Sequence, residues 1–120
     1  VSGIAPILWD EDRKVDIARI ANATAKLLEC DLELSPSDIL SSDEYIGERY
    51  GVLTQEGRDA LKLVAETEGI FLDPVYTSKA MAGMIDQIRK GIITKNETVV
   101  FIHTGGLPAL FAYAEDLMLS

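Results

Sequence analysis

The stretch of sequence that decides the fold is Val99-Val100-Phe101-Ile102-His103-Thr104-Gly105-Gly106-Leu107-Pro108-Ala109-Leu110. Residues 98–103 contain no Asp, Glu, Lys or Arg and are rich in β-branched and aromatic side chains, a pattern typical of a central parallel strand. Gly105 and Gly106 allow a tight turn, and Pro108 suits the first position of a helix. A strand, a glycine turn and a helix in this order predict an α/β unit.

Apolar periodicity predicts the other elements. The apolar run of residues 1–8 is typical of a buried strand, and residues 10–29 carry apolar side chains at spacings of three and four, which indicates an amphipathic helix. Two more helices are expected over residues 54–69, with a threonine cap and a terminal glycine, and over residues 77–91. The segment 73–76 is expected to be extended, because Pro74 disfavours the helical conformation of Asp73 before it.

The composition excludes several classes of protein. The 120 residues and 13.1 kDa are enough for one domain with a real core, and no apolar run approaches the roughly 20 residues of a membrane span. The net charge of −9, with no cluster of Lys and Arg, argues against a nucleic acid or an anionic membrane as partner. The single cysteine, Cys30, excludes an internal disulfide and is consistent with a reducing compartment, so we expect a cytoplasmic protein.

The start of the chain is unusual, because a buried strand at residues 1–8 makes an unlikely natural N-terminus. There is also no initiator methionine and no basic segment followed by a cleavage signal. We therefore expect residues 1–120 to be the C-terminal part of a longer chain.

Two helix starts carry polar side chains that could bind a ligand. Thr104, Gly105 and Gly106 would lie at the end of a strand, where backbone N–H groups favour anionic or electron-rich ligands, although a glycine pair can also be a simple turn. Tyr76 and Thr77 offer a phenol and a hydroxyl that could orient a polar ligand or pass a proton, although a threonine there can be a plain cap.

Other reactive side chains have weaker claims. Tyr50, beside a glycine in a polar loop, is expected to serve packing unless the fold brings it to the same cavity. His103 lacks a Ser or Cys nucleophile and further metal ligands, so we interpret it as structural and predict no metal site. Lys79 could be a Schiff-base lysine, but first-turn lysines are usually solvated. Cys30 is expected to pack rather than to react.

Taken together, four stretches resemble the C-terminal part of the D-cysteine desulfhydrase and 1-aminocyclopropane-1-carboxylate (ACC) deaminase family: Glu48-Arg49-Tyr50-Gly51, Glu68-Gly69-Ile70-Phe71-Leu72-Asp73-Pro74-Val75-Tyr76, Lys79 to Ile85, and His103-Thr104-Gly105-Gly106-Leu107-Pro108-Ala109-Leu110. The resemblance implies a pyridoxal-phosphate enzyme of the tryptophan-synthase-β-like fold (fold type II), in which three-layer αβα domains enclose a mostly parallel sheet. The family's Schiff-base lysine and phosphate loop lie upstream and have no counterpart in this chain, so the chain alone should be inactive. A homodimer of the complete protein is also implied.

The same resemblance implies roles for the residues at the helix starts. Tyr50 and Tyr76 would flank an amino-acid substrate and assist its orientation or proton transfer. Thr77 and Thr104 would lie near the pyridine nitrogen of the cofactor, and Gly105 would also contact the cofactor. Lys79 then loses its claim to the Schiff base.

Two positions favour one branch of the family. Sequences that resemble the ACC deaminases carry Glu and Leu where this chain has Thr77 and Thr104, and the hydroxyl pair resembles the D-cysteine desulfhydrases. A neutral hydroxyl protonates the pyridine less than a carboxylate does, which suffices when a good leaving group departs. We therefore expect elimination of hydrogen sulfide from D-cysteine, with ACC deamination or cysteate sulfo-lyase activity as alternatives. From another class, the chain could be a non-catalytic α/β module that binds an anion.

Overall fold

The computed structural model describes residues 1–9 and 12–118. The described residues form strands β1 (Ser2–Ile4) and β2 (Leu40–Ser42), helices α1 (Arg13–Leu27), α2 (Gln55–Glu68), α3 (Thr77–Arg89), α4 (Ala109–Ala112) and α5 (Ala114–Met118), and the 3-10 helix η1 (Pro36–Asp38). The predicted start of the first helix at residue 10 lies outside the described residues. Helix α1 is capped instead at Asp12, whose side chain accepts a hydrogen bond from Lys14 N at 3.1 Å.

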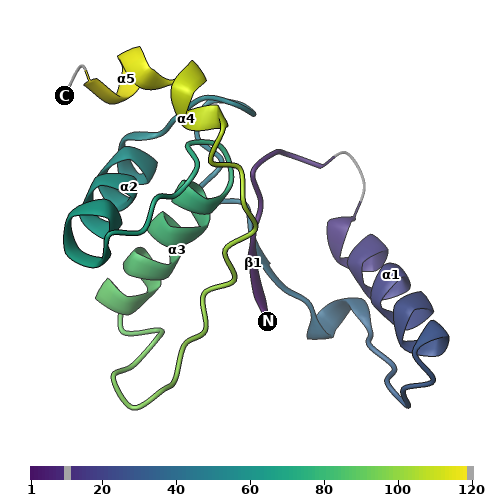
Figure 1. The fold of residues 1–120 in the computed structure, drawn as a ribbon. Coiled ribbons are helices and arrows are strands. Elements are labelled where there is room, and N and C mark those ends of the chain that lie inside the picture. Colours follow the sequence, from purple (N-terminus) through teal and green to yellow (C-terminus); the bar gives the residue numbers. More distant parts are fainter. Residues whose placement is uncertain (10–11, 119–120) are drawn as a thin grey trace.

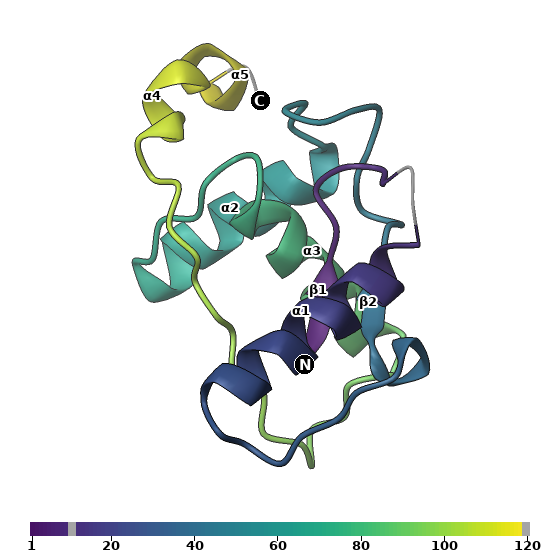
Figure 2. The same cartoon turned by 90° about the vertical axis from the view of Figure 1, so that its right-hand side faces the viewer.

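The strands and helices form three layers. Strands β1 and β2 pair in parallel, with Ser2 opposite Leu40 and Ile4 opposite Ser42. Helix α1 lies on one side of this pair, and α2 and α3 lie on the other (Figure 1), an arrangement that the second view confirms (Figure 2). The predicted α/β class with a parallel sheet between helices is therefore confirmed.

The core lies between α2 and α3, which their local signals define well. Thr54 caps α2 by accepting a hydrogen bond from Gly57 N at 3.0 Å, and Gly69 ends it in the left-handed conformation with a φ of 67°. The two helices bury one apolar cluster together with the residue that connects them: Ala60, Leu61, Val64, Leu72, Met81 and Ala82.

The predicted central strand at residues 98–103 is wrong for the structure described. This segment runs as an irregular chain beside α3, with Val100 and Ile102 mostly exposed. A strand needs a neighbour to satisfy its backbone N–H and C=O groups, and no described strand pairs with this segment. The single helix expected after the glycine turn is also wrong. The structure has two short helices there, α4 and α5.

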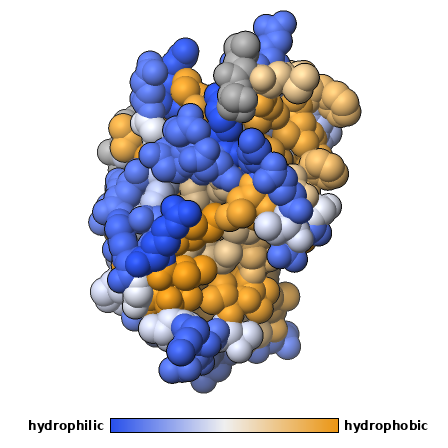
Figure 3. Space-filling model, turned by 90° about the vertical axis from the view of Figure 1, so that its left-hand side faces the viewer, coloured by the Kyte–Doolittle hydropathy of each residue, from blue (hydrophilic) through white to orange (hydrophobic). Residues whose placement is uncertain are grey.

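The surface of the chain is large and apolar for its mass. Its accessible area is 8616 Å², against about 6,400 Å² expected for a compact monomer of this mass, and its radius of gyration is 15.9 Å, against about 14 Å. On one face apolar residues gather into a broad area rather than lying scattered (Figure 3). Much of the apolar stripe of α1 is exposed as well, including Ile20 and Leu27. None of the described helices has the length and apolar character of a membrane span.

Candidate functional site

The start of α3 is organised by the buried carboxylate of Asp73. Its Oδ2 accepts hydrogen bonds from the backbone N–H groups of Val75 and Tyr76, both at 2.8 Å. Its Oδ1 accepts from the backbone N–H of Thr77 at 2.7 Å and from the Thr77 hydroxyl at 2.6 Å. Burial raises the pKa of Asp73, but these hydrogen bonds from Thr77, Tyr76 and Val75 outweigh it and hold the pKa below its ordinary value. The carboxylate is therefore ionised and fully satisfied at a helix N-terminus, where its charge is favoured.

This network corrects two expectations. Residues 74–76 form a turn rather than an extended segment, because the carboxylate draws three successive N–H groups around itself. Thr77 is not a cap, because the capping acceptor is Asp73. The sequence signal was present, since an acidic residue followed by Pro shortly before a helix is a frequent turn and cap pattern.

The two polar helix starts come together in space. His103 Nε2 lies 2.9 Å from the carbonyl oxygen of Phe71, and His103 Nδ1 accepts a hydrogen bond from Gly105 N at 3.1 Å. Since Nδ1 accepts, the proton is on Nε2 and points at the carbonyl. His103 thus links the glycine turn to the chain just before Asp73, which agrees with a structural role.

Gly106 packs directly on Asp73. Its φ is 91°, and a Cβ at this position would lie 2.7 Å from Cγ and 2.8 Å from Cβ of Asp73. Because the four hydrogen bonds fix that carboxylate, it cannot move aside cheaply. The close approach therefore requires glycine.

This contact gives a prediction with a matched control in the neighbouring residue. Gly106→Ala should lower the free energy of unfolding by about 3 kcal/mol or more, since a positive φ alone costs about 1–3 kcal/mol and the clash with Asp73 adds to it. Gly105→Ala has a similar φ of 94°, but its Cβ would meet no heavy atom of the described residues within 4 Å, so only the backbone cost applies. Denaturant unfolding of both variants of the complete protein measures the difference, and equal losses would contradict the close packing.

Tyr50 and Tyr76 form a hydroxyl pair at the same place. Their hydroxyl oxygens are hydrogen-bonded, their ring centroids are 6.0 Å apart, and their planes meet at 61°. The hydrogen bond with Tyr50, together with burial and the nearby charge of Asp73, raises the pKa of Tyr76. The Tyr113 hydroxyl donates to the carbonyl oxygen of Gly51 and so holds the residue next to Tyr50. Because one hydroxyl of the pair donates to the other, the second keeps its proton for a ligand.

A groove of about 560 Å³ joins three of the five predicted site residues. Tyr76, Thr77 and Thr104 line it, with residues 99–102 and part of β1 as apolar walls. Tyr50 reaches this site through its bond to Tyr76, and Gly105 lies next to Thr104 without lining the groove. Among the described residues no Lys, Arg or His lines the groove, so this chain offers no cation to a phosphate there.

Lys79 is not solvated as expected. Its side chain is buried, and its Nζ donates a hydrogen bond of 2.6 Å to the carbonyl oxygen of Ile46. This bond ties α3, which follows Tyr76, to the loop that leads to Tyr50. Burial lowers the pKa of the Lys79 ammonium below its usual value of 10.5. The sequence could not show this, because the covering loop lies more than 30 positions away in the chain.

Stability at alkaline pH tests the burial of Lys79. In the unfolded chain the amine holds its proton up to its usual pKa, whereas the folded protein releases it earlier, so stability gains from this group as pH rises through that window. The wild type should therefore gain stability relative to Lys79→Met between neutral pH and about pH 10. Lys62→Met, at an exposed position of α2, is the matched control. Parallel pH profiles for the wild type and Lys79→Met would show that the ammonium is not desolvated.

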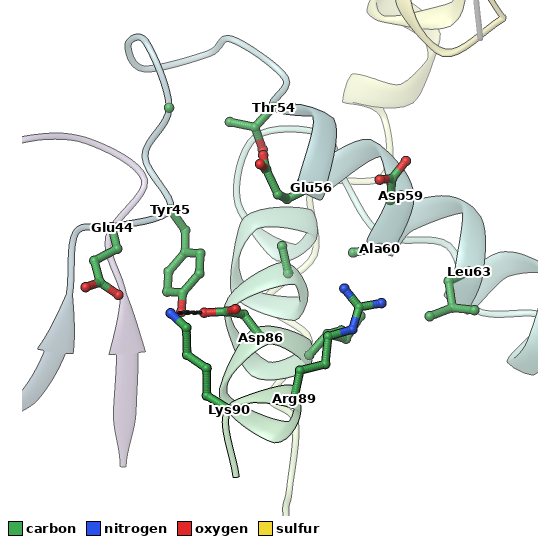
Figure 4. Close-up of a pocket in the computed structure, with 13 residues that line it drawn as sticks. Glu44, Tyr45, Thr54, Glu56, Asp59, Ala60, Leu63, Asp86, Arg89 and Lys90 are labelled. Atoms are coloured by element: carbon green, nitrogen blue, oxygen red, sulfur yellow. Dashed lines mark hydrogen bonds and ion pairs between the residues drawn. The ribbon is translucent and has the colours of Figure 1, made fainter. Parts of the chain in front are cut away.

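A second groove, of about 720 Å³, lies between the loop after β2 and helices α2 and α3 (Figure 4). Tyr45 donates a 2.6 Å hydrogen bond to Asp86, whose carboxylate also pairs with Lys90 at 2.7 Å. Lys90 and then Tyr45 lower the pKa of Asp86. These charges satisfy one another, and no predicted site residue lines this groove. Within the described part of the chain, no three His, Cys, Asp or Glu side chains are grouped to hold a metal.

Comparison with known proteins identifies the class of protein. A family model for pyridoxal-phosphate-dependent enzymes matches residues 6–105. The chain is also similar to a solved structure described as an ACC deaminase homologue, with a TM-score of 0.80 and 35% sequence identity over 98% of this chain. The chain therefore belongs to the pyridoxal-phosphate-dependent enzyme family.

These matches confirm the predicted family, its fold and its cofactor at once. The description of this structure as an ACC deaminase homologue agrees with the family that the sequence motifs resemble, and its fold is that of the described helices and strands. The chain covers 34% of that structure's length, about a third. The activity and substrate of the whole protein are therefore matters of proposal.

Proposed function

We propose that this chain is the C-terminal portion of a pyridoxal-phosphate-dependent lyase that converts D-cysteine and water to pyruvate, hydrogen sulfide and ammonia. The observation that carries the proposal is the groove in which Tyr76, Thr77 and Thr104 meet, with Tyr50 hydrogen-bonded to Tyr76. All four are residues for which the family resemblance implies contact with substrate or cofactor.

The excess surface of the chain supports its being one portion of the enzyme. An area of about 2,000 Å² beyond that of a compact monomer, including the exposed segment 98–103, calls for cover by further protein. The groove also lacks a lysine and a cation among the described residues. The upstream portion would then supply the Schiff-base lysine and the phosphate loop, and the isolated chain would be inactive. The complete protein is proposed to be a homodimer that acts on a small amino acid.

The residues present fit one side of a pyridoxal ring. The groove volume is within the usual range for a small-molecule site, its walls at residues 99–102 are apolar, and the hydroxyl-bearing residues Thr77 and Thr104 also line it. A Cβ at Gly105 would meet no atom of the described part of the chain within 4 Å, which leaves open space beside Thr104. When bound, pyridoxal phosphate supplies the electron sink for breaking bonds at the substrate α-carbon. Thr77 and Thr104 would hold the ring nitrogen, and the Tyr50 and Tyr76 pair would orient the substrate and move its proton.

The two hydroxyls favour elimination from D-cysteine. No carboxylate lines the groove among the described residues, so no direct ion pair strengthens the electron sink. A sulfur leaving group on the β-carbon departs readily without that help. Cysteate, which would release sulfite, is an alternative on the same ground, and opening of the ACC ring is the second alternative.

A non-catalytic anion-binding module is less well supported. That interpretation needs a helix dipole and N–H groups at the glycine turn, but α4 after this turn has only four residues. It also needs a counter-charge, and no cation lines the groove within the described residues.

A substrate panel tests the proposal. We expect the complete protein to release sulfide and pyruvate from D-cysteine, and less product from L-cysteine, cysteate and ACC. Ring opening of ACC without sulfide from D-cysteine would overturn the assignment. Thr104→Leu should lower kcat/KM for D-cysteine by about tenfold, the value of one lost hydrogen bond of 1.4 kcal/mol. Thr98→Leu, in the same segment but outside the groove, is the control.

A further inference from the structure

Tyr50 lies in a tight turn that a distant residue holds in place. The backbone N–H of Val52 donates to the carbonyl oxygen of Arg49 at 3.3 Å, which closes a β-turn. Tyr50 and Gly51 are its two central residues, and the φ of Gly51 is 79°, as a type II turn requires at this position. The carbonyl oxygen of Gly51 accepts a hydrogen bond from the hydroxyl of Tyr113, 62 positions along the chain. Because Gly51 directly follows Tyr50, this bond fixes the backbone that carries the Tyr50 side chain.

Side-chain packing alone holds Tyr50 weakly. Tyr50 and Tyr76 are 47% and 44% exposed, and their rings meet edge to face. A half-exposed ring has few buried contacts to fix it. The position of the Tyr50 hydroxyl therefore depends on how firmly the turn beneath it is held.

The loop that leads to this turn is fixed at its start. The carbonyl oxygen of Ile46 accepts a 2.6 Å hydrogen bond from Lys79 Nζ of helix α3. A Cβ at Gly47 would overlap the methyl group of Thr54, so the backbone of Gly47 packs directly on the cap of α2. Lys79 and Thr54 thus hold the beginning of residues 46–51, and Tyr113 holds the end.

Tyr113 belongs to the segment that also supports Tyr76. Tyr113 directly follows helix α4, whose Leu110 packs against the core between α2 and α3. Gly106, just before α4, packs on Asp73, and the carboxylate of Asp73 binds the backbone N–H of Tyr76. The segment after the glycine turn therefore contacts the supports of both tyrosines in the hydroxyl pair.

We propose that Tyr113 is a positioning residue for the hydroxyl pair: by holding the carbonyl oxygen of Gly51, it sets the hydroxyl of Tyr50 against that of Tyr76. The proposal rests on the part of the proposed function in which Tyr50 and Tyr76 orient the substrate, and it is independent of which amino acid is bound. Tyr113 does not line the groove, so it acts through Tyr50 and not on a ligand.

Titration of the tyrosines in the complete protein, without substrate, tests this inference. Tyrosine labelled with ¹³C at Cζ reports the ionisation of each phenol by NMR. In the wild type, Tyr76 should titrate above its ordinary pKa of 10.0, first because of its hydrogen bond with Tyr50. Tyr50→Phe removes that bond and should lower the pKa of Tyr76. Tyr113→Phe, which keeps the ring and removes only the hydroxyl, should lower it in the same direction.

Tyr45→Phe is the control for this titration, because the Tyr45 hydroxyl bonds Asp86 in the other groove, and it should leave the pKa of Tyr76 unchanged. A pKa of Tyr76 that falls in Tyr50→Phe but stays at the wild-type value in Tyr113→Phe would overturn the inference.

A double-mutant cycle separates positioning from a general loss of stability. Tyr113→Phe should lower kcat about tenfold when Tyr50 is present, the usual value of one lost hydrogen bond. In the Tyr50→Phe background it should change kcat by less than about twofold, because no hydroxyl is left to place. Equal losses in the two backgrounds would overturn the inference, since Tyr113 would then act independently of Tyr50. Failure of the proposed function is seen separately, as a complete protein that turns over no amino acid of the panel, and the titration still decides the role of Tyr113.

Discussion

Tyr76→Phe is expected to lower kcat of the complete enzyme by about 10²- to 10⁴-fold for whichever amino acid of the panel it turns over. This range is the usual contribution of a positioned acid or base. The Tyr76 phenol lines the groove, and its raised pKa, caused first by the hydrogen bond with Tyr50, keeps it protonated at neutral pH. It is therefore suited to donate a proton or a hydrogen bond rather than to act as an anionic base.

If the two phenols act as one unit, Tyr50→Phe should lower kcat by a comparable factor. The double variant should then have a kcat only a little below that of either single variant. Tyr45→Phe is the matched control, because its hydroxyl bonds Asp86 in the other groove. Steady-state kinetics give kcat and KM, and circular dichroism checks that each variant is folded. A full kcat in Tyr76→Phe would remove the tyrosine pair from the chemistry and leave it a role in binding.

The part of the fold that the sequence predicts is the part set by local signals. Helix α2 forms as expected because the Thr54 cap, the left-handed Gly69 and an apolar stripe act within a few residues of each other, and α3 begins at Thr77 as expected. The segment 98–103 has equally strong strand preferences, yet it is irregular in the structure. Strand formation depends on hydrogen bonds to another segment, and the described residues provide none there.

The site, like the fold, divides into residues that local sequence motifs predict and residues whose role depends on contacts between distant segments. Tyr76, Thr77 and Thr104 could be chosen from the sequence because the family motifs contain them, and the fold brings them to one groove. Asp73 and Lys79 were missed as functional supports, because their importance comes from burial. Composition alone makes both charged residues candidates for the surface, and only the packing of Gly106 and the loop at Ile46 shows otherwise.

Asp73→Ala is expected to lower the free energy of unfolding by about 4 kcal/mol. The change removes the acceptor of three backbone N–H groups and one hydroxyl at the start of α3. Each buried donor left without a partner costs about 1–3 kcal/mol, and water entering the vacated space recovers part of this cost. Denaturant unfolding of the complete protein measures the loss. Asp59→Ala is the control, because Asp59 is exposed on α2 and, among the described residues, accepts only from the side chain of Gln55, so its removal should cost less than about 0.5 kcal/mol.

The pH dependence of this loss separates the charge of Asp73 from its shape. The pKa of Asp73 is lowered in the folded protein from its ordinary value of 3.8, so its stabilisation is present above that value and is lost as pH falls through the lowered pKa. The difference in stability between the wild type and Asp73→Ala should therefore be constant near neutral pH and shrink in acid. A difference that persists below the folded pKa would mean that the packing of the side chain against Gly106, rather than its ionised hydrogen bonds, holds the start of α3. In that case a neutral Asp73 would leave α3 in place, and the orientation of the Thr77 hydroxyl would no longer depend on a charge.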